Sequence, residues 1–254
     1  MRKSLIRAGV VAASVASLAA LSAPAGSTPA APKPAAPSKV YVVHGLPLDK
    51  AGTKVDVYAG AAGGATADAG LIANDFTFKQ VAGPLSLAPA SYTVFVAAPT
   101  ASNDGVLSDA EVLFSKTLDV PSGKNLSAIA SFDASSNPTI NVFENDVTKA
   151  PSGGGRISIR HAAAAPEVVA DLGYYPWSRT YSFFSKRYGP VANGQQGTVT
   201  TVAGPYDVVI RVAANKARVA AIPRFAVQGS KLRAVYVVGK PGESLNFIVQ
   251  TINL

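Results

Sequence analysis

The sequence predicts an all-β fold, organised as two tandem β-sandwich (immunoglobulin-like) domains. Short stretches of alternating apolar residues recur along the chain, as in 39–45 (KVYVVHG), 91–98 (SYTVFVAA) and 206–213 (YDVVIRVA). Turn-forming Gly, Pro, Asn and Asp separate them at intervals of about eight to twelve residues, a spacing typical of sandwiches and barrels. None of these stretches keeps the 3.6-residue apolar period of a helix.

An internal repeat predicts that the fold occurs twice. The segment around His44 (KVYVVHGLP) is similar to the segment around His161 (RISIRHAAA), 117 residues later. The other corresponding positions are Asp56 with Asp171, and Tyr92 with Tyr206. Between the halves, 148–156 (TKAPSGGGR) contains Pro and three consecutive Gly, which interrupt strands. We therefore predict one sandwich over 38–149 and a second over 153–254.

The amino-terminal segment predicts export. Three basic residues precede an apolar run of about 14 residues, 8–21, and the small-residue pattern Ala-Pro-Ala follows at 23–25. This order is typical of a signal peptide, here 1–25, and the run is short of the roughly 20 residues of a membrane span. Residues 26–37 are a Pro/Ala-rich tether. We expect a secreted, extracellular protein without a stable membrane span; an uncleaved anchor is the alternative.

The chain has no Cys, so an exported protein of this composition must rely on its buried core and not on disulfides. About 215 residues follow the tether, enough for two domains that each bury a core.

Several short motifs resemble a known family. In the first half these are His44, Pro47, Asp49, Val55 to Tyr58 and 89–92 (PASY); in the second, His161, Pro166, Asp171 and 203–206 (AGPY). They resemble the secreted bacterial family called domain of unknown function 4397, and the likeness extends over about 38–254. The resemblance implies a β-sandwich and export but no chemistry. The sequence departs from it in an aromatic-rich segment near 173–190.

The paired His and Asp residues are the first candidates for chemistry. His44 with Asp56, and His161 with Asp171, are expected on adjacent strands, close enough to hydrogen bond, and these are the only two His of the chain. A nucleophilic site would also need an activated Ser, Thr or Cys and an oxyanion hole, and no G-x-S-x-G element occurs. A zinc site needs three or four ligands. The pairs are therefore predicted to be structural, with no catalytic, cofactor or metal site.

A second candidate is an acidic loop, 100–111, which offers oxygen ligands for calcium in Asn103, Asp104, Asp109 and Glu111. The residue order of a calcium-binding loop is missing, and Asn-Asp-Gly is common in turns. A solvated loop is the favoured interpretation.

The two halves carry opposite charge. Residues 38–149 contain seven Lys against eleven Asp and Glu, a net charge of −4; residues 150–254 contain twelve Lys and Arg against four Asp and Glu, a net charge of +8. A basic second domain suggests an acidic partner. Outside a cell this would be an anionic cell-wall polymer, a glycan or a protein; no nucleic-acid-binding module is recognisable, so nucleic acid is not expected. Docking of the acidic half on the basic half, within or between chains, is the alternative.

The segment 173–190 (GYYPWSRTYSFFSKRYGP) holds seven of the chain's twenty aromatic residues. As a strand it would place rings on both faces, interleaved with three cations. Tyr, Trp and Arg are enriched in binding hot spots. The candidate contact residues are Tyr174, Tyr175, Trp177, Arg179, Tyr181, Lys186, Arg187 and Tyr188. The alternative is that these rings complete the core or the junction between domains.

Together these observations favour a secreted, non-catalytic binding or structural module, associated with the cell wall or surface through its basic, aromatic-rich second domain. A self-assembling extracellular structural protein is the alternative. A hydrolase is the least favoured class, because no set of convergent acid and base groups is recognisable.

Overall fold

The computed structural model describes residues 35–47, 54–99, 106–151, 153–174, 183–240 and 245–254, with the backbone alone for 183–185. Within these ranges the protein consists of strands and two single-turn 3-10 helices, η1 (Thr66–Asp68) and η2 (Asp109–Glu111). No helix in this part of the chain is long and apolar enough to cross a membrane. The predicted all-β class is confirmed.

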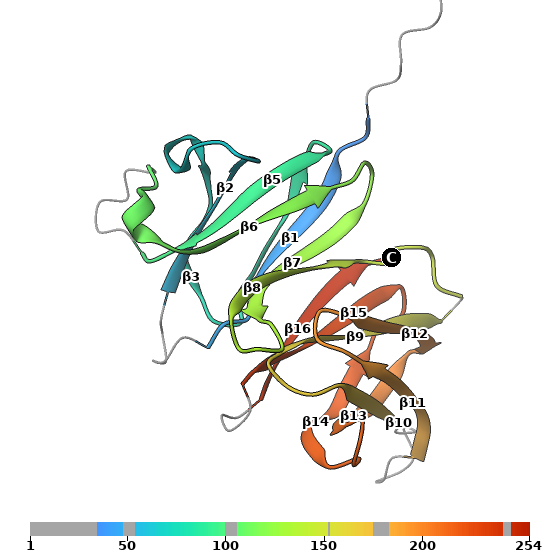
Figure 1. Ribbon diagram of the computed structural model, residues 1–254. Coiled ribbons are helices and arrows are strands. Elements are labelled where there is room, and N and C mark those ends of the chain that lie inside the picture. The colour runs from blue at the N-terminus through green and yellow to red at the C-terminus, as the bar shows by residue number, and fades with distance from the viewer. Residues whose placement is uncertain (1–34, 48–53, 100–105, 152, 175–182, 241–244) are drawn as a thin grey trace, which may run out of the picture. The chain divides into compact units, whose positions relative to one another are not determined.

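The described residues contain sixteen strands, which form four four-stranded sheets (Figure 1). The first eight strands are β1 (Ser38–His44), β2 (Lys54–Ala61), β3 (Gly70–Thr77), β4 (Val81–Leu87), β5 (Ala90–Ala97), β6 (Val112–Val120), β7 (Asn125–Phe132) and β8 (Pro138–Glu144). The second eight are β9 (Gly154–Ala163), β10 (Val168–Tyr174), β11 (Phe183–Val191), β12 (Gln196–Val202), β13 (Gly204–Val212), β14 (Arg218–Val227), β15 (Lys231–Gly239) and β16 (Asn246–Asn253).

The strand order of the first sandwich is repeated in the second. The first sandwich has the sheets β4-β1-β7-β8 and β3-β2-β5-β6, and the second has β12-β9-β15-β16 and β11-β10-β13-β14. Adding eight to each strand number of the first sandwich gives the order of the second. In both, the first and seventh strands pair in parallel, which Figure 1 shows for β1 beside β7. Two sandwiches of one topology are therefore present.

Alternating side chains build a core between the two sheets of each sandwich. In the first, Val55 and Val57 of β2 meet Ala128, Ala130 and Phe132 of β7. In the second, the core is larger and includes Ile157 and Ile159 of β9 and the fully enclosed Tyr206 of β13. Every second residue of these strands therefore points into the core, as the alternation of apolar residues in the sequence predicts.

The corresponding tyrosines Tyr92 and Tyr206 have one structural role. The Tyr92 hydroxyl donates to the carbonyl oxygen of Ala88 at 3.0 Å, and the Tyr206 hydroxyl donates to that of Val202 at 3.1 Å. Each hydroxyl therefore fixes the entry to its strand, as in the tyrosine corner of immunoglobulin-like sandwiches.

A third apolar cluster joins the sheet β4-β1-β7-β8 to the sheet β12-β9-β15-β16. Val43, Ile129 and Phe143 of the first sandwich pack there with residues of the second. The second sandwich contributes Ala162, Ala234, Tyr236, Val238 and Ile248. Strands β7, β9 and β15 of these sheets are covered on both faces, so they are buried along almost their whole length.

Arg160 lies in this junction with an exposed fraction of 0%. Its guanidinium donates to Asn145 Oδ1 at 2.5 Å, to the Tyr236 hydroxyl at 2.6 Å and to Gln196 Oε1 at 3.0 Å. It also lies over the rings of Phe143 and Tyr236, with its carbon 5.2 and 5.0 Å from their centroids. Burial lowers the pKa of the guanidinium, which nevertheless stays protonated.

No carboxylate of the described residues forms an ion pair with Arg160. Neutral oxygens and ring faces therefore stabilise this buried charge. Its partners come from β8, the following segment, β12 and β15, so one side chain connects both sandwiches.

We expect Arg160→Ala to lower the free energy of unfolding by about 3 kcal/mol, because it removes three hydrogen bonds that the buried guanidinium donates to Asn145, Gln196 and Tyr236. Arg160→Met should cost less, since it fills the space and removes the desolvation of a charge. Urea unfolding monitored by circular dichroism measures both. Equal stability of Arg160→Ala and the parent protein would contradict the assigned role.

The boundaries 38–149 and 153–254 remain predictions. Residues 38–149 expressed alone should unfold cooperatively, because every buried member of the first sandwich's core except Ala164 lies within that range. The fragment should also self-associate, because Val43, Ile129 and Phe143 become exposed. Urea unfolding and size-exclusion chromatography test these points, and a fragment without a cooperative transition would mean that the two sandwiches fold only together.

Candidate functional site

The two histidines are buried and have corresponding backbone contacts. His44 and His161 are 1% and 0% exposed. Nδ1 of His44 accepts from the Leu46 amide at 3.4 Å, and Nδ1 of His161 accepts from the Ala163 amide at 3.3 Å. Nε2 of His161 bonds to the Pro166 carbonyl oxygen at 2.9 Å. Each ring thus holds the segment that follows its strand, and neither is an accessible base.

The expectation that each His lies beside its Asp on an adjacent strand is wrong. His44 is in β1 and Asp56 in β2, which belong to opposite sheets of the first sandwich; His161 in β9 and Asp171 in β10 are separated in the same way. The sequence shows that these strands are consecutive, but consecutive strands in a sandwich can belong to different layers.

The two aspartates instead connect neighbouring strands of their own sheets. Asp56 Oδ1 accepts from the Asp75 amide of the edge strand β3 at 2.8 Å. Asp171 accepts from Arg187 of β11 at 2.6 and 2.9 Å and from Arg211 of β13 at 2.8 Å. In both sandwiches the second strand therefore uses this position to hold its edge neighbour.

Asp171 with Arg187 and Arg211 forms a charged cluster on the outer face of the sheet β11-β10-β13-β14. The flanking Ala170 and Leu172 of β10 point into the core, which directs Asp171 outward. Hydrogen bonds from Arg187 and Arg211 hold the pKa of the Asp171 carboxyl below its usual range. The side chains of Arg187 and Arg211 are 43% and 32% exposed. One carboxylate between two guanidiniums leaves a net positive charge at the surface.

Further cations lie on the same sheet and its connections. In the described residues from β10 to β14, six Lys and Arg accompany two Asp. Besides Arg187 and Arg211, they are Lys186, Lys216, Arg218 and Arg224, all exposed. We call these six residues the basic surface; it consists of the outer sheet of the second sandwich and its edges.

The structure places three of the remaining predicted contact residues. Tyr174 and Tyr188 are half-buried and pack against the core of the second sandwich, with Tyr174 5.2 Å from the ring of Tyr206. Lys186 is exposed and its ammonium lies 5.2 Å from the Tyr188 ring centroid. Tyr175, Trp177, Arg179 and Tyr181 lie outside the described residues. Of the predicted contact residues, Lys186 and Arg187 belong to the basic surface, and the two described tyrosines complete the core.

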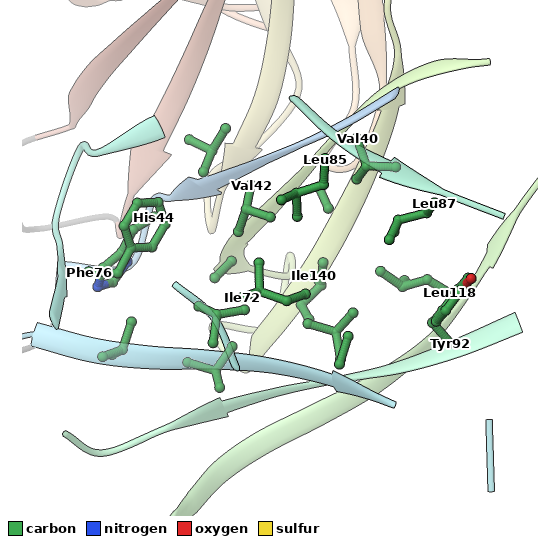
Figure 2. Close-up of a pocket in the computed structure, with 18 of the residues that line it drawn as sticks. Val40, Val42, His44, Ile72, Phe76, Leu85, Leu87, Tyr92, Leu118 and Ile140 are labelled. Carbon is green, nitrogen blue, oxygen red and sulfur yellow. The ribbon is translucent and has the colours of Figure 1, made fainter. Parts of the chain in front are cut away.

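The first sandwich contains an apolar cavity between its sheets. Figure 2 shows His44 and Phe76 at one end of it and Leu118 and Tyr92 at the other. Its volume is about 40 Å³. Small-molecule sites occupy roughly 300 Å³ or more, so this cavity is a packing defect of a valine-rich core and not a ligand site.

The two described candidates for calcium ligands, Asp109 and Glu111, make local structural contacts. Asp109 Oδ1 accepts from Thr66 Oγ1 at 2.6 Å, and Glu111 accepts from the Ser108 amide at 3.0 Å in a capping box around η2. Asn103 and Asp104 lie outside the described residues. Among the described residues, no group of three or more His, Cys, Asp and Glu side chains could hold a metal ion.

Three polar residues of the junction, Arg160, Asn145 and Gln196, are not distinguished by the sequence. Arg160 follows an alternating pattern and looks like the solvent side of a strand, while Asn145 stands in an ordinary turn sequence, FEND. No local signal distinguishes a polar side chain that faces water from one that faces a second sandwich.

The protein is thus an all-β protein of two sandwiches, each made of two four-stranded sheets, and the outer sheet of the second sandwich is basic. The chain belongs to the family described as domain of unknown function (DUF4397), whose model matches residues 38–171. The match covers the first sandwich and the second as far as Asp171.

Solved structures overlap with this chain only loosely. The fimbrial anchor protein Mfa2 from Porphyromonas gingivalis has 8% identity and a TM-score of 0.28, over 86% of this chain and 98% of that chain. A family CBM26 domain of Eubacterium rectale Amy13K, solved with maltoheptaose, has 11% identity and a TM-score of 0.26, over 85% of this chain and 98% of that chain. The Bacillus anthracis TIE protein has 10% identity and a TM-score of 0.24, over 81% of this chain and 34% of that chain. TM-scores this low do not assign a role to the chain. No curated protein matches the sequence.

The buried state of His44 predicts a dependence of stability on pH. Burial lowers the pKa of His44 from 6.5 to about 4. The folded state therefore takes up the proton less readily than the unfolded state. The contribution of His44 to the free energy of unfolding is therefore fully present above pH 6.5, the pKa of the group in the unfolded chain. It falls by about 3 kcal/mol as the pH is lowered from 6.5 toward 4. Burial also lowers the pKa of His161, which adds a loss in the same direction.

We expect His44→Gln to be less stable than the parent at neutral pH, because it loses the ring contact with Phe76, and to lose less stability at about pH 4.5. Urea unfolding at both pH values gives the two differences. His161→Gln keeps the His44 ring and should therefore retain the part of the pH dependence that His44 contributes. An unchanged pH dependence in His44→Gln would contradict the prediction.

Proposed function

We propose that this chain is an exported, non-catalytic binding module that attaches to an anionic polymer of the cell wall or surface through the basic surface of its second sandwich. The observation that carries the proposal is the concentration of six Lys and Arg beside two Asp in the described part of β10 to β14. Such a surface attracts and retains polyanions by its summed field.

The arrangement of the basic surface supports this role. Arg187 and Arg211 are held in place by Asp171, so two guanidiniums are presented from a rigid sheet. Lys216 and Arg218 lie exposed where the chain passes from β13 to β14. A polymer with charges at intervals fits a spread of separate cations better than a single small anion does.

A non-catalytic role fits the remaining chemistry. Both histidines of the chain are buried and bonded to backbone groups, and the cavity between the sheets of the first sandwich is apolar and small. The export signal predicted from 1–25 would bring the protein to anionic wall polymers. A hydrolase is not supported by any pair of described side chains.

A direct test measures retention of the mature protein on dextran sulfate, with neutral dextran as the matched polymer. We expect binding to dextran sulfate alone, and release by salt, because exposed charges are screened at high ionic strength. The double variant Lys186→Glu and Arg218→Glu should bind at least about ten-fold more weakly.

The control is Lys39→Glu with Lys54→Glu, which makes the same change of charge on exposed lysines of the first sandwich. It should reduce binding much less. Equal losses in the two double variants would show that net charge alone governs retention, and the assignment to the basic surface would be wrong.

Head-to-tail self-assembly is a second candidate, favoured by the net charges of −4 and +8 on the two halves. Sedimentation of the mature protein at low and high salt separates the two. Salt-sensitive oligomers that disappear in the Lys186→Glu and Arg218→Glu variant would favour assembly, and a monomer at all concentrations would exclude it.

A further inference from the structure

We propose that a polar pocket at the junction of the two sandwiches, above Arg160, is a binding site for an uncharged saccharide ring. The pocket has a volume of about 490 Å³, within the range of roughly 300–1,000 Å³ for small-molecule sites. It is separate from the basic surface, and the inference does not depend on the function proposed above.

Three segments form the pocket. Gly123, Lys124 and Asn125 come from the turn into β7, residues 144–148 come from the end of β8 and the chain beyond it, and Gln196 begins β12. Of the nine lining residues only Gly123 and Val147 lack a polar side chain. The pocket therefore combines hydrogen-bonding groups from both sandwiches.

The buried Arg160 orders the floor of this pocket. Its guanidinium donates to Asn145 Oδ1 and to Gln196 Oε1, and both of these residues line the pocket. The two carbonyl oxygens are thereby turned inward, toward the charge. Their amide groups are also held, because Asn145 Nδ2 donates to Asn125 Oδ1 at 2.7 Å and Gln196 Nε2 donates to the Glu144 carbonyl oxygen at 2.9 Å.

These contacts leave defined hydrogen-bonding groups for a ligand. Since Asn125 Oδ1 accepts from Asn145, the side-chain amide of Asn125 is directed by its own carbonyl and can donate from a fixed position. Lys124 and Glu144, paired at 2.7 Å and each about half exposed, add further donors and acceptors at the rim. Groups fixed in this way before binding lose little entropy when a ligand arrives.

The chemistry of the walls selects the ligand class. Each rim carboxylate has a cation beside it: Glu144 pairs with Lys124, and Asp146 pairs with Arg156 at 3.3 Å. With Arg160 included, these five groups carry a net charge of +1, which disfavours a cation and gives no strong charge for a polyanion. Val147 is the only apolar side chain of the lining, which disfavours a lipid.

A sugar ring satisfies these conditions. Each of its hydroxyls both donates and accepts, which suits a wall that offers the Asn125 amide, the Lys124 ammonium and the Glu144 carboxylate. A site of such fixed polar groups favours a ligand that can use all of them, because polar groups that a ligand shields from water without bonding to them are costly. The structure thus points to a pyranose of one or two residues.

The test titrates the mature protein with glucose, galactose, mannose, arabinose and N-acetylglucosamine at high salt, where attachment through the basic surface is screened. Nuclear magnetic resonance follows the side-chain amide signals of Asn125, Asn145 and Gln196. We expect at least one sugar to shift these signals in a saturable way at millimolar concentration. If none of the sugars shifts them, the proposal is wrong.

Two variants locate the site. Asn125→Ala and Lys124→Ala should each weaken binding of the responding sugar about ten-fold. The matched control is Lys231→Ala, because Lys231 is the residue of the second sandwich that corresponds to Lys124. Asn125 pairs with Lys39 between β7 and β1, and Leu232 pairs with Arg156 between β15 and β9. Lys124 and Lys231 directly precede these two corresponding residues. The control should bind like the parent protein.

The two variants together distinguish loss of sugar binding from loss of folding. Lys124 lies at the surface, so Lys124→Ala keeps the test valid even if Asn125→Ala unfolds because Asn145 loses its partner. Unchanged binding in Lys124→Ala, or an equal loss in Lys231→Ala, would overturn the assignment. Binding to dextran sulfate is measured on the same variants; if it persists while no sugar binds, the pocket proposal fails and the function of the basic surface stands.

Discussion

The structure depends on the burial of two sheets on both of their faces. The sheets β4-β1-β7-β8 and β12-β9-β15-β16 each contribute one face to a sandwich core and the other to a shared cluster around Phe143, Tyr236 and Ile248. A strand in such a layer needs apolar side chains on both sides, and the long buried strands β9 and β15 meet this requirement. The polar exceptions in this layer therefore have specific partners.

Arg160 is the most costly of these exceptions, and the surrounding groups explain how it is accommodated. Its charge is distributed over neutral oxygens and two aromatic rings, with contributions from both sandwiches. Such an arrangement adds little net stability compared with an apolar core, but it requires one geometry, because each partner must lie within hydrogen-bonding distance. A buried guanidinium of this kind fixes how the two halves meet, and by the same contacts it orders Asn145 and Gln196 in the pocket above it.

The two sandwiches share their internal anchors and differ on their outer surfaces. Tyr92 and Tyr206 bond to the carbonyl four residues before them, and His44 and His161 hold the segments after β1 and β9. At the position of Asp56 and Asp171, the first sandwich uses a backbone contact and the second uses two arginines. The repeated scaffold is thus kept while the second copy has a positively charged face that the first lacks.

The sequence by itself determined the all-β class, the presence of two similar halves, the family and the opposite charge of the halves. These properties follow from local patterns: period-two alternation, turn residues and residue counts. Only the tertiary structure decided that β1 and β2 lie in opposite sheets, that Tyr174 and Tyr188 pack on the core, and that Arg160 faces a second sandwich and not water. The physical reason is that alternation defines two faces of a strand but not what covers each face. What covers a face depends on contacts between residues far apart in the chain, such as Arg160 with Tyr236 and Ser127 with Gln250.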